Sequence, residues 1–211
     1  MKRLGGWIAV LLLLSSAAWA QEEEKRSHFA VGLGYGAVLF EDDVYQDFFD
    51  QDMLPAGELS VSVYPVRNLA LTAGSGYLFQ SGKAIGELSG EPSGEELELT
   101  IVPVYGQVGY RFDFADEQWV VPSLAAGGDY WLYWEKNEFE KDVEGGKSGW
   151  HATAGLGVLL DQIEPDASFN LMSEFGIENT FLELTATRTW MNGDGLDFSG
   201  WVFQGGFLFE F

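Results

Sequence analysis

The chain has 211 residues, no cysteine and a formal net charge of −22, from 11 Lys and Arg against 33 Asp and Glu. Nucleic-acid binding is excluded because it needs clustered basic side chains, and without cysteine neither a disulfide framework nor a lipoprotein anchor can form. Strong acidity with few aromatic residues would indicate disorder, but aromatic residues make up 15% of this chain.

The first 20 residues predict a signal peptide. Met1–Arg3 supply positive charge, Trp7–Leu14 form a short apolar run, and Ala18–Ala20 has the small-x-small pattern of a cleavage site. A membrane-spanning anchor is the alternative, but crossing the bilayer core takes about 20 apolar residues. We therefore expect residues 1–20 to be removed and residues 21–211 to form one mature domain.

The first segment of the mature domain with a regular pattern alternates as a strand does. One parity holds Phe29, Val31, Leu33, Tyr35, Ala37 and Leu39, and the other holds Ala30, Gly32, Gly34 and Gly36. Side chains alternate across a strand, so one face is apolar and the other is nearly bare. Glycine weakens an ordinary strand, and its repetition here suits a narrow lumen in which opposing strands crowd.

Seven further segments carry strand patterns. In chain order they are Glu58 to Tyr64, Leu69 to Phe79, Leu97 to Phe112, Trp119 to Tyr133, Trp150 to Val158, Thr180 to Trp190 and Trp201 to Phe211. The third changes its apolar parity along its length and the fourth mixes its faces. Most are close to the roughly ten residues of a tilted transmembrane strand, and closed bacterial barrels have an even strand number. The sequence predicts an all-β fold, an antiparallel up-and-down transmembrane barrel of eight strands.

The connections between these segments alternate in length, as short periplasmic turns and long extracellular loops do. Short turns are expected at Val66–Asn68 and Asp113–Gln118, and the other side carries long acidic loops. The acids gather at Glu41–Asp52, at Glu87–Glu96, at Glu135–Glu144 and at Asp194 and Asp197. Asp161–Phe175 is an exception, a long periplasmic connection in which Pro165 predicts a short helix. We favour a surface helix that fills this turn over one that caps the lumen or docks on a partner.

This topology predicts the location of two sets of residues, one at the membrane boundary and one in the lumen. Trp134, Trp150, Trp190 and Trp201 flank the long loops and are expected to form a girdle at the membrane boundary, where amphipathic rings are favoured. His151, Glu183, Gln204 and Glu210 lie on the lumen-facing parity. Eight strands leave an interior just wide enough for side chains to fill. A hydrogen-bonded plug is therefore expected instead of an open water channel.

The chain ends Phe207-Leu208-Phe209-Glu210-Phe211, with alternating aromatics and a final Phe, and Tyr110-Arg111-Phe112 precedes a short turn. In these features it resembles the small eight-stranded outer-membrane β-barrel family that includes the OmpA membrane domain, OmpX and OmpW. The resemblance implies a bacterial outer-membrane location among lipids and lipopolysaccharide. It also implies that Phe207, Phe209 and Phe211 are read by the barrel-assembly machinery. No peptidoglycan-binding domain like that of OmpA is expected after Phe211.

Arg188 stands beside Trp190 on the lipid-facing parity, where a charge is tolerated near the interface but not at the bilayer centre. It either snorkels at the outer rim or pairs with a lipopolysaccharide phosphate.

Two segments are similar to known binding motifs. Gly32-x-Gly34-x-x-Ala37 is similar by letter to a dinucleotide fingerprint, which needs a following helix, but strand alternation continues through it. No cofactor is therefore expected. Gly193–Phe198 resembles one copy of a calcium-binding nonapeptide repeat that works when stacked, so Asp194 and Asp197 are weak metal candidates. Dense loop carboxylates favour weak, shared binding of divalent cations instead.

The mature chain has two histidines, His28 and His151. Lipid A deacylases resembling PagL use a lipid-facing His–Ser pair, whereas His151 lies on the lumen parity, and omptin-like proteases are longer barrels. We expect the protein not to be an enzyme. The favoured function is structural or surface contact through the acidic extracellular loops. A narrow channel for small solutes, with lateral exit into the membrane, is the alternative, and a lipid A-modifying enzyme is the third.

Overall fold

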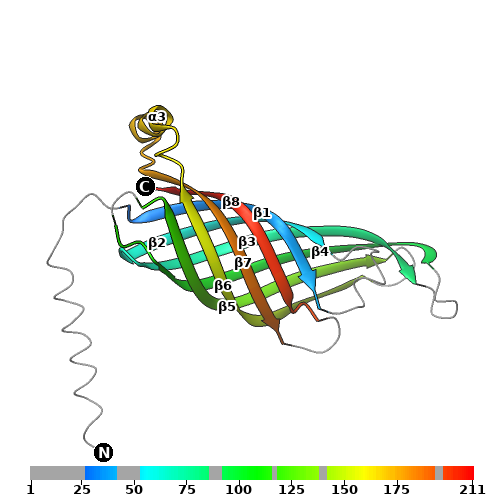
Figure 1. Ribbon diagram of the computed structural model, residues 1–211. Coiled ribbons are helices and arrows are strands. Elements are labelled where there is room, and N and C mark those ends of the chain that lie inside the picture. Colours follow the sequence, from blue (N-terminus) through cyan, green and yellow to red (C-terminus); the bar gives the residue numbers. More distant parts are fainter. Residues whose placement is uncertain (1–26, 42–52, 86–91, 116–117, 138–141, 193–196) are drawn as a thin grey trace, which may run out of the picture.

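The protein, seen here in a computed structural model, is described for residues 27–41, 53–85, 92–115, 118–137, 142–192 and 197–211. These residues form eight strands and one helix (Figure 1). The elements are β1 (Phe29–Phe40), β2 (Leu54–Val66), β3 (Leu69–Ile85), β4 (Pro92–Arg111), β5 (Val120–Asn137), β6 (Val143–Leu159), α3 (Pro165–Phe175), β7 (Asn179–Met191) and β8 (Gly200–Glu210). The expected signal peptide, residues 1–20, lies outside the described residues and stays a prediction.

Each strand pairs antiparallel with its neighbour in the chain, and β8 pairs with β1 to close the barrel. This confirms the predicted eight-stranded up-and-down architecture. We call the end with the β2–β3, β4–β5 and β6–β7 connections the inner end, and the opposite end the outer end. Within the described part of the chain, no helix is long and apolar enough to cross a membrane.

The strands differ in length, and the difference lies at the outer end. β3, β4, β5 and β6 have 17, 20, 18 and 17 residues, whereas β1, β2, β7 and β8 have 11 to 13. The hairpins continue pairing outward, for example between Ile85 and Pro92 and between Glu135 and Val143. The long strands project past the rest of the barrel in Figure 1.

These extensions correct one sequence-based expectation. The acidic segments Glu87–Glu96 and Glu135–Glu144 were expected to be loops, but Glu95, Glu96, Glu135 and Glu144 lie on β4, β5 and β6. Pairing across the hairpins satisfies backbone hydrogen bonds there whatever the side chains are. A prediction of the strand ends from polar composition alone therefore ended these strands too early. Residues 42–52, 86–91, 138–141 and 193–196, which hold most of the other predicted loop acids, lie outside the described residues.

The irregular patterns of β4 and β5 have a simple cause inside the barrel. Leu99, Ile101 and Trp131 face inward and are buried, whereas Val108 and Leu124 are exposed on the outer wall. The apolar residues of β4 thus face the interior at the outer end and the outer wall nearer the inner end, and in β5 the buried Trp131 lies beside the exposed Tyr130. Alternation disappears from the sequence at such a place, although the strand itself continues without interruption.

The glycines of β1 lie on the inward parity, and the closest backbone approach occurs where β1 pairs with β8. A Cβ on Gly36 would overlap the backbone carbonyl oxygen of Phe203, and one on Gly206 would overlap that of Leu33. Both positions belong to the β1–β8 pairing that closes the barrel. The crowding thus comes from the adjacent strand, not from the opposing strands that the sequence suggested.

The predicted helix is present as α3, in the connection between β6 and β7. Pro165 stands in its first turn, and Gly176 ends it with a left-handed φ of 72°, a conformation that glycine adopts at no steric cost. Figure 1 shows α3 beside the barrel wall at the inner end and not across the mouth, so it does not cap the lumen.

Candidate functional site

The interior of the barrel is the candidate site, and its outer end is filled by an apolar cluster. We call this set the outer plug: it consists of Val38, Leu54, Ala56, Leu78, Leu99, Ile101, Trp131, Phe198 and Val202, with Phe40, Tyr133 and Met191 packed against it. The ring of Phe198 stacks on Trp131 with centroids 6.0 Å apart and lies 5.3 Å from the Tyr133 ring. Unlike most of the plug, Phe198 comes from the connection between β7 and β8.

Hydrogen bonds hold Phe198 and Ser199 inside the barrel mouth. Thr189 Oγ1 donates to the carbonyl oxygens of Phe198 and Gly200 at 3.4 and 3.3 Å, and Ser199 Oγ accepts from the Met191 N–H at 3.0 Å. The Ser199 N–H donates to Asp197 Oδ1 at 2.8 Å. Partial burial acts to raise the pKa of Asp197, but the hydrogen bonds from Ser199 together with the positive charges of Lys147 and Arg188 hold this pKa below its ordinary value.

A second set of buried side chains packs at the inner end, and we call it the inner plug. It consists of Ala30, Tyr64, Ala70, Val121, Leu159, Phe181 and Leu208. The guanidinium of Arg111 lies within it, 4.7 Å above the Phe181 ring. Arg111 pairs with Glu210 and donates to Tyr64 Oη at 3.0 Å, while Asn179 Nδ2 donates to the other Glu210 oxygen at 3.1 Å. The side chains of Arg111 and Glu210 are only 11% and 9% exposed.

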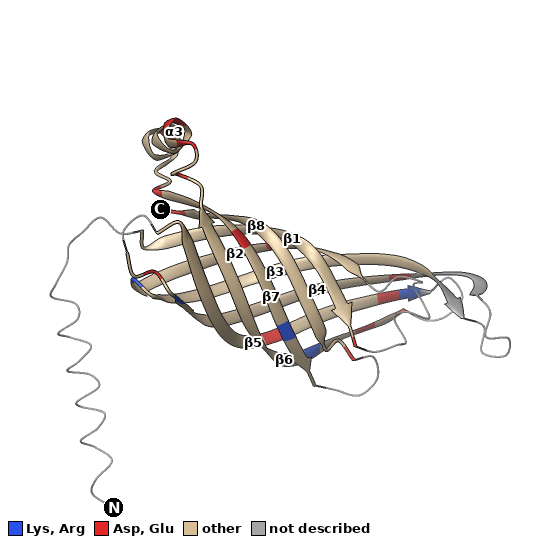
Figure 2. Ribbon diagram, in the orientation of Figure 1, with Lys and Arg blue, Asp and Glu red and all other residues tan. Residues whose placement is uncertain are grey.

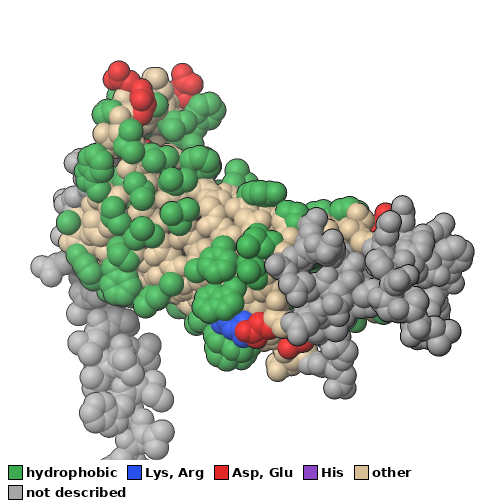
Figure 3. All heavy atoms as spheres, turned by 45° about the vertical axis from the view of Figure 1, so that its right-hand side comes forward, with side chains coloured by type: hydrophobic (Ala, Val, Ile, Leu, Met, Phe, Trp, Pro, Cys, Tyr) green, Lys and Arg blue, Asp and Glu red, His purple; other side chains and the backbone are tan. Residues whose placement is uncertain are grey.

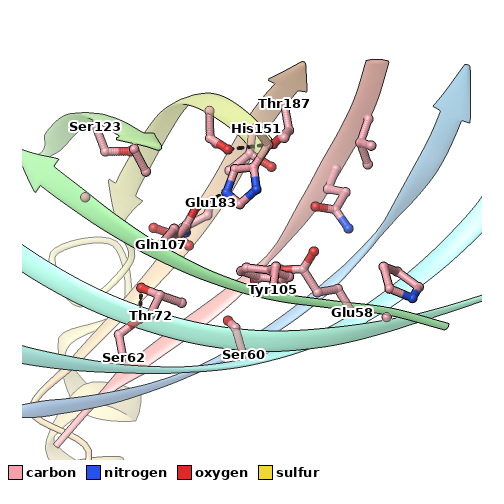
Figure 4. A pocket seen from close by; sticks show the side chains of 18 of the residues that line it. Glu58, Ser60, Ser62, Thr72, Tyr105, Gln107, Ser123, His151, Glu183 and Thr187 are labelled. Carbon is pink, nitrogen blue, oxygen red and sulfur yellow. Dashed lines mark hydrogen bonds between the residues drawn. The ribbon is translucent and has the colours of Figure 1, made fainter. Parts of the chain in front are cut away.

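Between the two plugs lies a cavity of about 160 Å³ with a mainly polar middle (Figure 4). His151 Nδ1 is 2.7 Å from Asp129 Oδ2, and His151 Nε2 is 3.0 Å from Gln107 Oε1. Tyr105 meets the imidazole edge to face at 5.7 Å and donates to Glu58 Oε1 at 2.6 Å. Thr153 pairs with Thr187, and Ser62 with Thr72. The interior polar groups therefore largely satisfy one another.

This arrangement lacks what nucleophilic catalysis needs. An activated nucleophile must be within hydrogen-bond reach of its base, but the ring nitrogens of His151 are engaged by Asp129 and Gln107. Among the described residues, no group of three or more His, Asp or Glu side chains is placed to hold a metal ion. Asp197 instead caps the turn before Ser199, and Asp194 lies outside the described residues.

The residues predicted to face the lumen all point inward. His151, Glu183 and Gln204 line the cavity, and Glu210 belongs with the inner plug. Glu183 has room because its neighbours across both pairings are Gly157 and Gly206. Sequence reasoning missed Arg111 as the partner of Glu210. The available signal was a basic residue on the inward parity of β4.

The residues predicted for the membrane girdle and the assembly signal lie on the outer wall. Trp134, Trp150 and Trp201 are exposed there, and Trp190 stacks on Trp150 with centroids 3.9 Å apart. Phe207 stacks on Phe209, and Phe211 contacts Phe29. Their roles in the membrane boundary and in assembly stay predictions.

Arg188 is also on the outer wall, near the rim. Its guanidinium pairs with Glu41 at 2.5 Å and lies over the rings of Trp190 and Trp201, at 5.4 and 5.8 Å. A carboxylate thus already balances this charge, which accords with a snorkelling residue at the rim. Pairing with a lipopolysaccharide phosphate stays a prediction, and an unchanged lipid-binding profile for Arg188→Ala would contradict it.

The comparisons with known proteins agree with this geometry. The profile of the outer membrane protein beta-barrel domain family matches residues 8–211. OprG from Pseudomonas aeruginosa superposes with a TM-score of 0.63 at 12% identity, covering 89% of this chain and 97% of that one. Neisserial surface protein A superposes with a TM-score of 0.58 at 11% identity, and the match covers 89% of this chain and 100% of that one. The N-terminal β-barrel domain of Pseudomonas aeruginosa OprF superposes with a TM-score of 0.51 at 13% identity, and the match covers 89% of this chain and 98% of that one. At such identities the likeness concerns the fold. A search of curated proteins gives no match.

Proposed function

Because the chain belongs to the outer membrane protein beta-barrel domain family and lies in the bacterial outer membrane, we propose that it is a sealed, non-enzymatic barrel. Its work is structural or is done by the surface it presents outside the membrane. The observation that supports this proposal is the packing of two sets of buried side chains inside the barrel, one toward each end.

The two plugs act on ion passage in different ways. The outer plug is a packed apolar layer, and apolar constrictions exclude water and ions by dewetting. The inner plug adds a paired Arg111 and Glu210, whose charges are satisfied where they stand. An ion that crossed the barrel would have to break this pair and open a layer that contains Phe198 and Trp131. The cavity between the plugs is therefore proposed to hold water without conducting.

The interior also supports the absence of enzymatic activity. His151 has an acidic partner but lies sealed within the barrel, where no lipid or peptide substrate reaches it. The third alternative, modification of lipid A, predicts an altered lipid A mass spectrum in cells that produce the protein. We expect spectra identical to those of cells that do not produce it, and a difference between the two would contradict the proposal.

The outer surface is the remaining place for function. β3 to β6 extend beyond the other strands, and exposed acidic side chains such as Glu98 and Glu144 lie on them; Figure 2 shows charged residues near these outer ends. Carboxylates that are close together favour counter-ions. We propose that this surface makes contacts outside the cell and shares weakly bound divalent cations. Recognition of Phe207, Phe209 and Phe211 by the assembly machinery during biogenesis belongs to the same proposal.

Conductance of the refolded mature protein in a planar bilayer tests the sealed barrel. We expect no discrete current steps at moderate voltage, because neither plug leaves a continuous polar path. A trimeric porin in the same bilayer serves as the positive control, and heat-modifiable gel migration shows that the barrel is folded. Reproducible single-channel steps from folded protein would contradict the proposal.

A narrow, gated channel is the second candidate, and one observation favours it. Phe198 closes the outer end but belongs to a connection, not to the wall, and the polar cavity lies directly beneath the plug. If that connection moved, the outer end would lose its central ring. The effect of replacing Phe198, described in the Discussion, distinguishes the two candidates.

A further inference from the structure

The helix α3 exposes an apolar face that no strand covers. Phe169, Met172 and Phe175 are 71%, 44% and 65% exposed, and no residue of α3 is buried. Residues three or four apart share one face of a helix, so these three side chains form a single stripe. Ile163, just before the helix, is 59% exposed as well. Such a concentration of exposed apolar side chains indicates a binding surface.

The opposite face of α3 is polar. Asp166, Asn170 and Glu174 follow each other at intervals of four and are all exposed, so they form a second stripe. In Figure 3 acidic side chains gather at the tip of this projection, and hydrophobic side chains lie between them and the barrel wall. Two separate faces of this kind are typical of a helix that lies in a membrane interface.

The position of α3 decides what covers its apolar face. The helix stands beside the wall at the inner end, near Phe211 (Figure 1). Short turns mark the periplasmic side of such barrels, so this level corresponds to the inner leaflet of the outer membrane. The base of the connection is held by the Leu160 N–H, which donates to Thr180 O at 2.8 Å, and by the Thr180 N–H, which donates to Asp161 at 3.1 Å.

The lipid-facing wall continues toward this helix. Phe207 is 47% exposed on β8, and the rings of Phe29 and Phe211 contact each other at the inner end. The apolar stripe of α3 therefore extends an interface that the barrel already makes with lipid. A helix over the barrel mouth would not have had this continuity.

We propose that α3 is an interfacial helix that inserts Phe169, Met172 and Phe175 into the inner, phospholipid leaflet of the outer membrane. Its polar stripe then stays among the headgroups and water. α3 contains no Lys or Arg, so its attachment depends on buried apolar area and not on attraction to anionic lipid. It holds the inner end of the barrel at the depth of the interface. The inference requires only the membrane location and holds whether or not the barrel conducts.

The chain has no cysteine, so a single introduced cysteine can be labelled uniquely. Phe169→Cys and Met172→Cys place a polarity-sensitive fluorophore on the apolar stripe, and Asp166→Cys and Asn170→Cys are the matched controls on the polar stripe. The whole mature barrel is reconstituted in phosphatidylcholine nanodiscs, with and without lipids brominated near the headgroup. We expect a blue-shifted emission and loss of intensity on brominated lipid for the first pair, and water-like emission without quenching for the controls.

Each outcome separates the proposal from its alternatives. Water-like, unquenched emission at all four positions in correctly folded barrels would overturn it. A label at Phe169 that is solvated in nanodiscs but shielded in isolated outer membranes would also overturn it, and would indicate a periplasmic protein as the occupant. Quenching should persist in high salt and when part of the lipid is anionic, because apolar insertion does not depend on charge. Attachment through electrostatic attraction would instead weaken as salt screens the charges. Loss of quenching in high salt would contradict apolar insertion.

Discussion

Replacing Arg111 with alanine should lower the free energy of unfolding of the barrel by about 3–5 kcal/mol, the usual effect of breaking a buried ion pair. The substitution leaves the Glu210 carboxylate charged within the inner plug. Among the described residues, only Asn179 then remains to donate to it. It also removes the hydrogen bond to Tyr64 and the guanidinium above the Phe181 ring. Urea titration of folded protein in vesicles, followed by tryptophan fluorescence, measures the change.

A matched control for this prediction exists at the inner end. Arg67 pairs with Asp113 at 3.4 Å, and both side chains are 29% exposed, so Arg67→Ala should change stability by at most about 1 kcal/mol. The double variant Arg111→Met with Glu210→Leu should recover much of the loss, because replacing both members of a buried pair with apolar groups is often close to neutral. Equal effects of Arg111→Ala and Arg67→Ala would show that the inner plug does not depend on this pair.

Replacing Phe198 with alanine should also destabilise the barrel, by about 3–5 kcal/mol, the usual range for a buried phenylalanine. The ring packs against Trp131, Tyr133 and Phe40, and its removal leaves a cavity in the outer plug. Phe203→Ala is the control. That side chain is exposed on the lipid-facing wall, where fluid lipid fills the space and no rigid cavity forms. A loss of unfolding free energy for Phe198→Ala no larger than that for Phe203→Ala would contradict the packing described for Phe198.

The same variant decides between the sealed barrel and the gated channel. The wall residues of the outer plug, among them Leu54, Leu99 and Ile101, remain when Phe198 is truncated. We therefore expect Phe198→Ala, once folded and inserted, to stay electrically silent. Discrete current steps from Phe198→Ala, together with silence from the natural chain, would favour the gated channel and identify Phe198 as part of the gate.

The candidate site was only partly readable from the sequence. Strand parity placed His151, Glu183 and Gln204 on the inward face, because alternation is a local property of the backbone. It did not reveal that Asp129 and Gln107 would meet His151, since these residues lie on three different strands and 22 and 44 positions away in the chain. Such contacts depend on how neighbouring strands are aligned, and a shift of one residue would turn every side chain to the other face.

By itself, the sequence determined the strand number, the closed antiparallel architecture and the helical connection after β6. Each of these follows from local periodicity, from glycine and proline placement, and from the need to leave no open strand edge in lipid. Only the tertiary structure decided that Arg111 meets Glu210, 99 positions away, and that Phe198 turns back into the outer mouth. It also decided that β3 to β6 extend beyond the neighbouring strands at the outer end and that α3 lies beside the wall. These features arise where distant segments share one narrow interior or one level of the membrane, and pairing across the closed sheet, not local pattern, brings them together.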